Sequence, residues 1–251
     1  MIASGGGHTA YALAVGLRLR ELYPRAEITY IVSPDDTWSI KRIKKLDPRA
    51  EIIGITKPLH PLEPYYTVFK RVSKTLVESI KNIDDGVILC TGSNHNLLPV
   101  VVAKTKHILP IYCVEDVFRF KKKSRTVAIL HRFMNINVFL QWREQYKLYP
   151  SRSKYVGILY EKPIYSTRDQ GYILVVTGTI GHRELFKLLM KTRLENLVIQ
   201  TGRIDPRLLK RRGWKVFRFN PDIDRLIANA SLVIASPGIT AINAVQAYGK
   251  P

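Results

Sequence analysis

The sequence contains few cysteines: only Cys90 and Cys113 occur among its 251 residues. Both lie inside apolar runs that are typical of strands, and nothing near them has the spacing of metal ligands. We therefore expect two core thiols in a reducing compartment and no metal site.

Long hydrophobic segments are also missing. No uninterrupted apolar run approaches the roughly 20 residues that span a bilayer, and the N-terminus lacks a charged region followed by a hydrophobic one. The chain has neither the G-x-G-x-x-G pattern of dinucleotide-binding enzymes nor the Lys-Ser/Thr of a P-loop. We expect a cytoplasmic protein, or one that is peripheral on the cytoplasmic face of a membrane.

Acidic residues are scarce, with 20 Asp and Glu against 40 Lys and Arg, which gives a formal net charge of +20. Such a charge attracts anionic partners such as nucleic acid, anionic lipid headgroups or sugar nucleotides. No recognised nucleic-acid motif accompanies the charge, and the aromatic residues do not form a stacking platform. We therefore expect no nucleic-acid partner.

The most informative stretch runs from Ile2 to Tyr23. Two apolar residues lead into Ser4-Gly5-Gly6-Gly7-His8-Thr9, and apolar residues then recur at helical spacing. The order predicts a strand end, a glycine turn and a helix. Glycines let the backbone approach a ligand, and the free N–H groups of a helix start favour negative charge, such as a diphosphate or a phosphorylated lipid. A plain glycine-rich connection is the alternative.

Short apolar strands alternate with helices along the whole chain, which predicts an α/β fold. Parallel sheets covered on both faces bind ligands beyond the carboxyl ends of their strands. The pattern breaks at Tyr160 to Gly171, which we interpret as an interdomain linker. The expected domains are 1–165 and 166–251, two Rossmann-like halves that face a cleft as in the GT-B glycosyltransferase outline. The second domain looks incomplete, since the chain stops where another strand is expected.

The first half of the chain also contains one predicted loop and, directly after it, one predicted long helix. Lys57 to Pro64 contains three prolines and is predicted to be a loop. Tyr65 to Ile80 reads as a long helix whose apolar residues share one face, namely Val68, Val72, Leu76 and Ile80.

Several motifs resemble one known family. Ser4 to Thr9, Val114-Glu115-Asp116-Val117-Phe118-Arg119 and Phe139-Leu140-Gln141-Trp142 are similar to the membrane subunit, asparagine-linked glycosylation protein fourteen, of a UDP-N-acetylglucosamine transferase. From Tyr172 onward the chain resembles the catalytic subunit, protein thirteen, through Val175 to Thr179, Val198 to Gly202, Asp224 to Ile227 and Ser231 to Ile234. The order and spacing agree over nearly the whole chain, as in a fusion of the two subunits.

The resemblance implies a GT-B enzyme that transfers N-acetylglucosamine from its UDP conjugate to a polyprenyl-diphosphate-linked sugar, with inversion and without a metal or other cofactor. Three departures bear on the donor sugar. Tyr11 stands where the family usually has an acidic residue, and Ser236-Pro237-Gly238 replaces His-Ala-Gly. The acidic residue that relatives use near the ribose falls on Ala244, or on Asn243 after a one-residue deletion.

For the acceptor side, His8 is the candidate base that takes the proton of the acceptor hydroxyl, because a neutral imidazole is available near pH 7. Its simpler alternative is a histidine hydrogen-bonded within the turn. Glu115 is expected to aid the base and Arg119 to meet the lipid diphosphate, unless both belong to a solvated charged loop. The expected acceptor-side contacts also include Gly6, Gly7, Thr9, Gly92, Ser93 and Asn94.

For the donor side, the diphosphate is expected at the start of the helix after Gly238, where N–H groups and a partial positive charge of ~0.5 favour it. The other expected donor contacts lie in the turns after strands and at the start of this helix, with Asn243 further along it. Simple turn residues, and a helix-surface Asn, are the alternatives. The expected donor contacts are Gly178, Thr179, Gln200, Gly202, Ser236, Gly238, Ile239, Thr240 and Asn243.

A basic run, Lys121-Lys122-Lys123-Arg125, precedes an apolar group formed by Val127, Ile129, Leu130 and Phe133. This combination suits a helix that lies on an anionic membrane surface, with ~1 kcal/mol available per basic residue near the surface. A core-packed helix with a basic outer face is the alternative. A second copy of the chain or a membrane-anchoring partner is a further candidate partner.

Two other functions compete with this one. A transferase of the same build that uses UDP-glucuronate for surface polysaccharide would need a cation aimed at the sugar carboxylate. A noncatalytic scaffold that binds the lipid acceptor and recruits a separate catalytic chain is consistent with the altered nucleotide motif.

Overall fold

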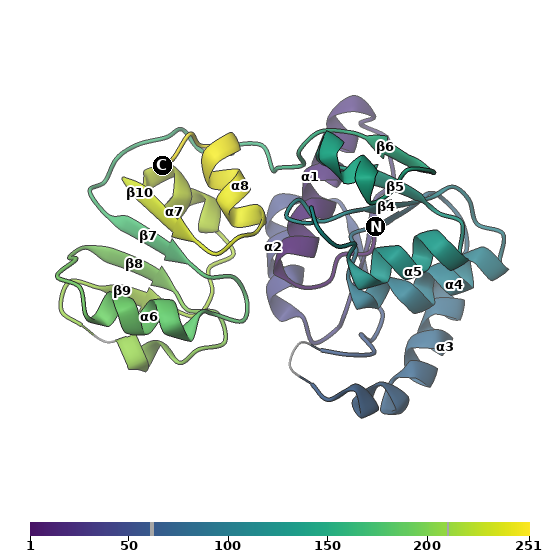
Figure 1. Cartoon of the computed structure of the whole chain (residues 1–251), viewed down its shortest axis with the longest axis horizontal. Coiled ribbons are helices and arrows are strands. Elements are labelled where there is room, and N and C mark those ends of the chain that lie inside the picture. The colour runs from purple at the N-terminus through teal and green to yellow at the C-terminus, as the bar shows by residue number, and fades with distance from the viewer. Residues whose placement is uncertain (61–62, 210) are drawn as a thin grey trace. The chain divides into compact units, whose positions relative to one another are not determined.

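The computed structural model describes residues 1–60, 63–209 and 211–251, and its chain divides into two compact units, Met1–Leu159 and Tyr160–Pro251 (Figure 1). Every strand pair in both units is parallel. The fold class is therefore α/β with parallel sheets, as the alternating pattern predicts. The boundary lies between residues 159 and 160, rather than between 165 and 166.

Unit 1 is built on two parallel sheets that the start of the chain joins. Ile2 forms bridges to Ile31 on one side and to Cys90 on the other, so the first residues act as a central strand. The strand order is β1-β2 in one sheet and β3-β4-β5-β6 in the other. Their bounds are β1 (Thr29–Val32), β2 (Glu51–Gly54), β3 (Ile88–Cys90), β4 (Ile111–Val114), β5 (Asn137–Leu140) and β6 (Ser153–Tyr155).

The core of unit 1 consists of aliphatic strand and helix residues, among which Ile2, Val100, Leu130 and Leu140 are almost fully buried. Cys90 and Cys113 face each other in the β3–β4 register and are free, buried thiols, as expected. The α-helices are α1 (Gly6–Leu22), α2 (Thr37–Leu46), α3 (Val72–Asn82), α4 (Leu97–Thr105) and α5 (Arg125–Phe133). Three short 3-10 helices are η1 (Tyr65–Lys70), η2 (Asn94–Asn96) and η3 (Arg143–Lys147).

The predicted long helix over Tyr65 to Ile80 consists of two elements, η1 and α3, and α3 presents a neighbouring face to the core, about 100° round the helix. Its buried residues are Thr75 and Ser79, whereas Leu76, Val77 and Ile80 are exposed. The hydroxyl groups of Thr75 and Ser79 donate hydrogen bonds to carbonyl oxygens of Arg71 and Thr75, so they are satisfied inside the protein. The apolar spacing identified a shared face correctly, but that face points to solvent.

The predicted loop over Lys57 to Pro64 includes residues 61 and 62, which lie outside the described residues. Helix α5 packs Val127 and Leu130 into the core and exposes Ile129 and Phe133. Half of the apolar group that was expected on a membrane thus belongs to the core.

Unit 2 contains one parallel sheet of order β10-β7-β8-β9. Its strands are β7 (Ile173–Val176), β8 (Leu197–Gln200), β9 (Lys215–Phe217) and β10 (Leu232–Ala235). Its helices are α6 (Arg183–Met190), η4 (Pro206–Leu209), α7 (Ile223–Asn229) and α8 (Ile239–Gln246). Two apolar clusters on this sheet, one around Leu174 and Ile227 and one around Val175 and Phe186, form its core.

The predicted interdomain linker, Tyr160 to Gly171, packs on unit 2. Glu161 is buried, and its backbone N–H donates to the side chain of Asn243. The N–H groups of Arg168 and Gln170 donate to carbonyl oxygens at the end of α7. These bonds hold the segment against unit 2, although its polar composition is typical of an open linker.

Gly202 is a stability determinant of unit 2, because it has a positive φ of 65° and a side chain there would meet the carbonyl oxygen of Gly178 at 2.5 Å. We expect Gly202→Ala to lower the free energy of unfolding by about 3 kcal/mol or more, through left-handed strain and overpacking. Gly171→Ala is the matched control, since it has a similar φ of 72° and open space around it. Its expected cost is about 1 kcal/mol. Urea unfolding followed by circular dichroism measures both variants. Equal free energies of unfolding would contradict the expectation.

Candidate functional site

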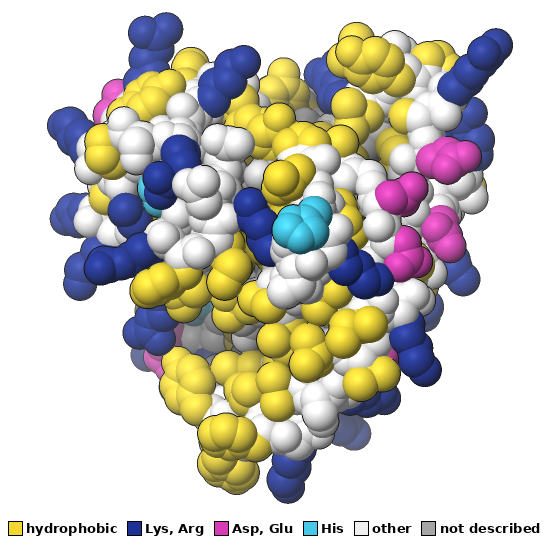
Figure 2. All heavy atoms as spheres, turned by 90° about the vertical axis from the view of Figure 1, so that its right-hand side faces the viewer, with side chains coloured by type: hydrophobic (Ala, Val, Ile, Leu, Met, Phe, Trp, Pro, Cys, Tyr) yellow, Lys and Arg dark blue, Asp and Glu magenta, His cyan; other side chains and the backbone are white. Residues whose placement is uncertain are grey.

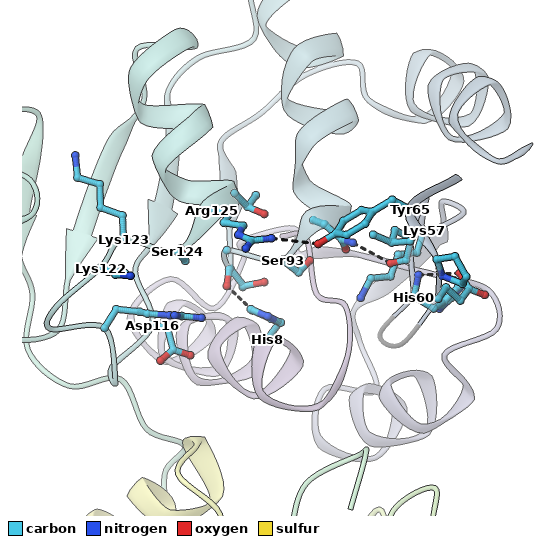
Figure 3. Close-up of a pocket in the computed structure, with 18 residues that line it drawn as sticks. His8, Lys57, His60, Tyr65, Ser93, Asp116, Lys122, Lys123, Ser124 and Arg125 are labelled. Atoms are coloured by element: carbon cyan, nitrogen blue, oxygen red, sulfur yellow. Dashed lines mark hydrogen bonds between the residues drawn. The ribbon is translucent and has the colours of Figure 1, made fainter. Parts of the chain in front are cut away.

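A cavity of about 1060 Å³ lies in unit 1 beyond the carboxyl ends of its strands (Figure 3). Four segments contribute to it: the start of α1, the chain after β2, the turn after β3 and the loop after β4. Its lining residues are His8, Lys57, Leu59, His60, Glu63, Pro64, Tyr65, Thr91, Gly92, Ser93, Asn94, Asp116, Arg119, Lys122, Lys123, Ser124, Arg125 and Thr126.

The glycine turn of the sequence becomes the first turn of α1. Gly5 has a φ of 83° and precedes the helix, and its N–H donates to the carboxylate of Asp36 at 2.8 Å. Gly6 and Gly7 begin the helix itself. Thr9 is buried and hydrogen-bonds to Ser39 of α2 at 2.7 Å. The side chain of Thr9 therefore turns toward α2 and is not among the cavity-lining residues, and its expected ligand contact stays a prediction.

His8 reaches the cavity from the first turn of α1. Its Nδ1 lies 2.5 Å from the carbonyl oxygen of Thr91. A carbonyl can only accept, so this bond places the proton of a neutral imidazole on Nδ1 and leaves Nε2 basic. Burial lowers the pKa of His8, the Thr91 bond opposes this, and the positive charge of Lys57 lowers it further, while Asp116 raises it. The imidazole is thus neutral near pH 7.

The turn after β3 lies beside His8. Gly92 has a φ of 86°, and a side chain there would lie 3.3 Å from both the Val114 carbonyl oxygen and the Val127 side chain. Ser93 and Asn94 line the cavity as expected, and Asn94 also donates to the carbonyl oxygen of Leu59 at 2.9 Å. Gly92 therefore permits a close approach that brings the turn, the β4 loop and α5 together.

Glu115 is not among the residues that line the cavity, although it was expected there to aid the base. It is fully buried, and its carboxylate accepts hydrogen bonds from the N–H of Asp116 at 2.8 Å, the N–H of Ser124 at 3.1 Å and the hydroxyl of Tyr149. One carboxylate therefore closes both ends of the 116–124 loop. Burial and the adjacent Glu115 raise the pKa of Tyr149, which keeps its hydroxyl protonated as the donor. Asp116, unlike Glu115, lines the cavity, as does Glu63.

Residues after β5 hold the carbonyl side of the same loop. Gln141 donates to the carbonyl oxygen of Glu115 at 2.8 Å, Trp142 to that of Val117 at 3.0 Å, and Gln145 to those of Asp116 and Arg119. The hydroxyl of Tyr11, the residue that departs from the family pattern, accepts from the N–H of Val117 at 3.3 Å. The two sequence motifs after β4 and β5 are thus parts of one structure that shapes the cavity.

The cavity is rich in cations from two elements. Arg119, Lys122 and Lys123 lie in the loop after β4 and Arg125 is the first residue of α5, and all four are exposed. Lys57 lies after β2 and is only 8% exposed. In the view of Figure 3, Lys57 and His60 lie on one side of His8, and Lys122, Lys123 and Asp116 on the other. Sequence reasoning missed Lys57, although its place after a strand end was a usable signal.

In unit 2, three of the predicted donor contacts, Gly178, Thr179 and Gly202, pack together. A side chain on Gly202 would lie 2.5 and 2.6 Å from the carbonyl oxygens of Gly178 and Thr179. The carbonyl oxygen of Thr179 also accepts from the N–H of Arg203 at 2.9 Å. Gln200 accepts from the N–H of Asn220 at 2.9 Å through its side-chain oxygen. These residues shape the turns after β7 and β8, and the Gln200 oxygen is occupied within the unit.

Helix α8 begins directly after the predicted turn at the end of β10. Gly238 precedes its first residue, Ile239, and no side chain caps the helix start. Ile239 is buried, whereas Ser236 and Thr240 are half-buried. Asn243 is buried, accepts from the N–H of Glu161 at 3.1 Å, and donates to the Glu161 carboxylate at 2.7 Å. In this arrangement the Asn243 amide holds the 160–171 segment, and its expected bond to a ribose stays a prediction.

Across the described ranges, no group of three or more His, Cys, Asp or Glu side chains is arranged to hold a metal ion.

Solved structures with the same fold were found, whereas no family model and no curated protein sequence matches the chain. MurG of Acinetobacter baumannii is 16% identical with a TM-score of 0.54 over 99% of this chain and 76% of its own. A UGT transferase from Siraitia grosvenorii in complex with UDP is 12% identical, with a TM-score of 0.55 over 100% and 80%. UDP-GlcNAc 2-epimerase from Neisseria meningitidis, bound to UDP-GlcNAc, is 11% identical, with a TM-score of 0.62 over 100% and 80%. The fold is that of GT-B proteins.

Removing the Glu115 carboxylate should destabilise unit 1. In Glu115→Ala, two buried N–H groups and the Tyr149 hydroxyl lose their acceptor, so we expect the free energy of unfolding to fall by about 3 kcal/mol or more. Asp116→Ala is the control, and because that side chain is half-exposed, a loss of about 1 kcal/mol or less is expected. Urea titration measures both. A stable Glu115→Ala protein that had lost only its activity would support the original catalytic assignment instead.

Proposed function

We propose that this protein is a glycosyltransferase that moves a sugar from a UDP conjugate to a hydroxyl group bound in the unit 1 cavity. The observation that carries the proposal is the imidazole of His8, which is neutral, has its basic Nε2 set by the Thr91 bond and lies in a cation-rich cavity. The GT-B fold supports it, as do neighbours that are described as bound to UDP or UDP-GlcNAc.

In this reaction the acceptor oxygen forms a bond to the anomeric carbon while the bond from that carbon to the diphosphate oxygen breaks. The electron pair leaves with UDP, and the hydroxyl proton moves to Nε2 of His8. General base catalysis of this kind contributes roughly 10²- to 10⁴-fold. Attack opposite the leaving group inverts the anomeric centre. No step of this scheme uses a metal or another cofactor.

For the donor, we infer that the diphosphate binds at the start of α8. The turn over Ser236, Gly238, Ile239 and Thr240 leaves the first N–H groups of that helix without a side-chain cap. Such groups, with the helix dipole, favour an anion that gains charge as it leaves. Because Gln200 and Asn243 are engaged inside unit 2, backbone groups at this turn are the stronger candidates for the phosphate contacts. N-acetylglucosamine is the proposed sugar, on the resemblance of the motifs.

For the acceptor, we infer a sugar linked through a diphosphate to a polyprenyl chain. The cavity combines cations with an aromatic edge, because Tyr65 lines it and is 71% exposed. The hydroxyl of Tyr65 accepts from Arg125 at 3.1 Å, which connects the aromatic edge to the basic loop. A ligand with an anionic head and an apolar tail fits both features.

The surface beside that edge suits a membrane. We define the η1–α3 surface by the exposed side chains of Tyr65, Tyr66, Phe69, Leu76, Val77 and Ile80. Figure 2 looks at the side of unit 1 that carries α3 and α4, and hydrophobic side chains gather across its lower part among Lys and Arg. Exposed apolar groups beside basic residues favour an anionic lipid surface. Among the helices of the described residues, none is long and apolar enough to cross a bilayer. We therefore propose peripheral attachment at the cytoplasmic face.

The function is tested by incubating the protein with radiolabelled UDP-sugars and membrane lipid extract and measuring labelled lipid. We expect His8→Gln to lower transfer by roughly 10²-fold or more and to leave UDP affinity nearly unchanged. The wild-type rate should fall only below pH 6.5, because the His8 pKa is lowered and the neutral form persists to that point. His107→Asn, at an exposed position with a positive φ that Asn tolerates, is the control.

Normal turnover of His8→Gln would exclude the base role. A protein that bound lipid acceptor but failed to bind UDP would instead favour the noncatalytic scaffold, and selective labelling from UDP-glucuronate would favour the polysaccharide transferase.

Membrane attachment is tested by sedimentation with vesicles of phosphatidylcholine, with and without phosphatidylglycerol. Phe69→Ser combined with Val77→Ser should weaken binding to the anionic vesicles by at least about tenfold, because two exposed apolar side chains no longer enter the lipid. The matched control replaces Leu188 and Leu208, which are exposed in unit 2. Equal binding of both double variants would place the attachment elsewhere.

A further inference from the structure

Lys57 is a buried cation whose position is set by the ends of two strands. After β2, the N–H of Ile55 donates to the carbonyl oxygen of Val32, and the N–H of Lys57 donates to the hydroxyl of Ser33, both at 3.0 Å. These bonds continue the pairing of β1 and β2 past the sheet edge. They place Lys57 at the cavity with only 8% of its surface exposed. Lysine is rarely buried to this degree, because an ammonium group loses hydration there.

The ammonium group of Lys57 lies over the glycine turn that begins α1. A side chain built on Gly5 would lie 4.0 Å from its Nζ. The charge also reaches both neighbouring imidazoles: burial lowers the pKa of His95 to about 4 and Lys57 adds to that effect, as it does for His8. The cation, the first turn of α1 and His8 therefore share the floor of the cavity.

We propose that Lys57 binds the phosphate group of the acceptor at the floor of this cavity, beside His8. The proposal rests on the proposed function and makes it more specific. Arg119, the residue expected from the sequence to meet the diphosphate, is exposed, as are Lys122, Lys123 and Arg125. Water and salt screen those four charges, whereas a buried ammonium attracts a phosphate through a medium of lower dielectric constant. Lys57 therefore dominates affinity, and the exposed cations form an outer rim.

This placement couples acceptor binding to the base. The charged groups that face His8 are Lys57 from the end of β2 and Asp116 from the end of β4, with the Thr91 carbonyl from the end of β3. The rim cations and Glu63 line the same cavity. A phosphate bound to Lys57 offsets its positive charge, so the imidazole becomes a stronger base when the acceptor is present.

The test uses the full chain and measures binding of inorganic diphosphate and of farnesyl diphosphate by calorimetry. We expect Lys57→Met to weaken binding of both probes by at least about tenfold, the loss of one buried charge-assisted contact. Lys44→Met, at an exposed position on α2, should stay within about twofold of wild type. Lys57→Arg keeps the charge and should retain most of the affinity. It shows whether a folded protein with a cation at this position binds the probes, should Lys57→Met fold poorly. Undiminished affinity of a folded Lys57→Met protein for both probes would overturn the proposal.

A second readout follows the His8 imidazole by NMR during a pH titration. Its pKa should rise in Lys57→Met and stay unchanged in Lys44→Met, and an unchanged pKa in both would contradict the coupling. Loss of only the farnesyl probe would exclude Lys57 as the phosphate contact, because the inorganic probe carries the same phosphates. Lys57-dependent binding without sugar transfer would leave the phosphate site standing and refute the proposed function. Sugar transfer that survives Lys57→Met unchanged would leave the proposed function standing and refute Lys57 as the acceptor's phosphate contact.

Discussion

The insertion of the first residues between β1 and β3 is the contact on which the cavity of unit 1 depends. The N–H of Ile2 donates to the carbonyl oxygen of Leu89, that of Ala3 to Ile31, and the hydroxyl of Thr91 donates back to the carbonyl oxygen of Ile2. After Ala3 the chain leaves the sheet and starts α1 at the carboxyl edge. The same Thr91 then meets the imidazole of His8 through its carbonyl oxygen. One residue thus links the sheet pairing to the protonation pattern of the proposed base.

Two buried charges beside this edge have different tasks. Glu115 satisfies three donors and holds both ends of a loop, so its negative charge is used within the fold. Lys57 is held by its backbone, and its ammonium group lies at the floor of the cavity. A buried ion is costly unless hydrogen bonds or an opposite charge offset that cost. The carboxylate therefore orders the loop that presents the exposed cations, whereas Lys57 brings positive charge to the cavity from the end of β2.

The sequence predicted the alternation of strands and helices in both units, because strands covered on both faces are continuous apolar runs bounded by turn residues. It also assigned residues of the glycine turn, the turn at Gly92 and the loop after Val114 to one side of the reaction, the acceptor side. It did not predict which way α3 faces. Periodicity shows that Leu76 and Ile80 share a face, but Thr75 and Ser79 bury a neighbouring face. Both bond to carbonyl oxygens of their own helix or its cap, and Thr75 also bonds to that of Thr56. Intrahelical hydrogen bonds make the burial of these hydroxyl groups inexpensive, and no spacing rule reveals that.

The sequence by itself determined the α/β class, the two-part division and the set of loops that form the carboxyl edge, since these follow from local hydrophobic patterns and from the geometry common to parallel sheets. The tertiary structure alone decided the role of each polar side chain. Thr9 bonds to α2, Asn243 holds the segment before β7, and Lys57 enters the cavity from a loop that appeared unremarkable. The physical reason is that a side chain's direction and partners depend on strand register and on neighbours distant in sequence, which no local pattern records.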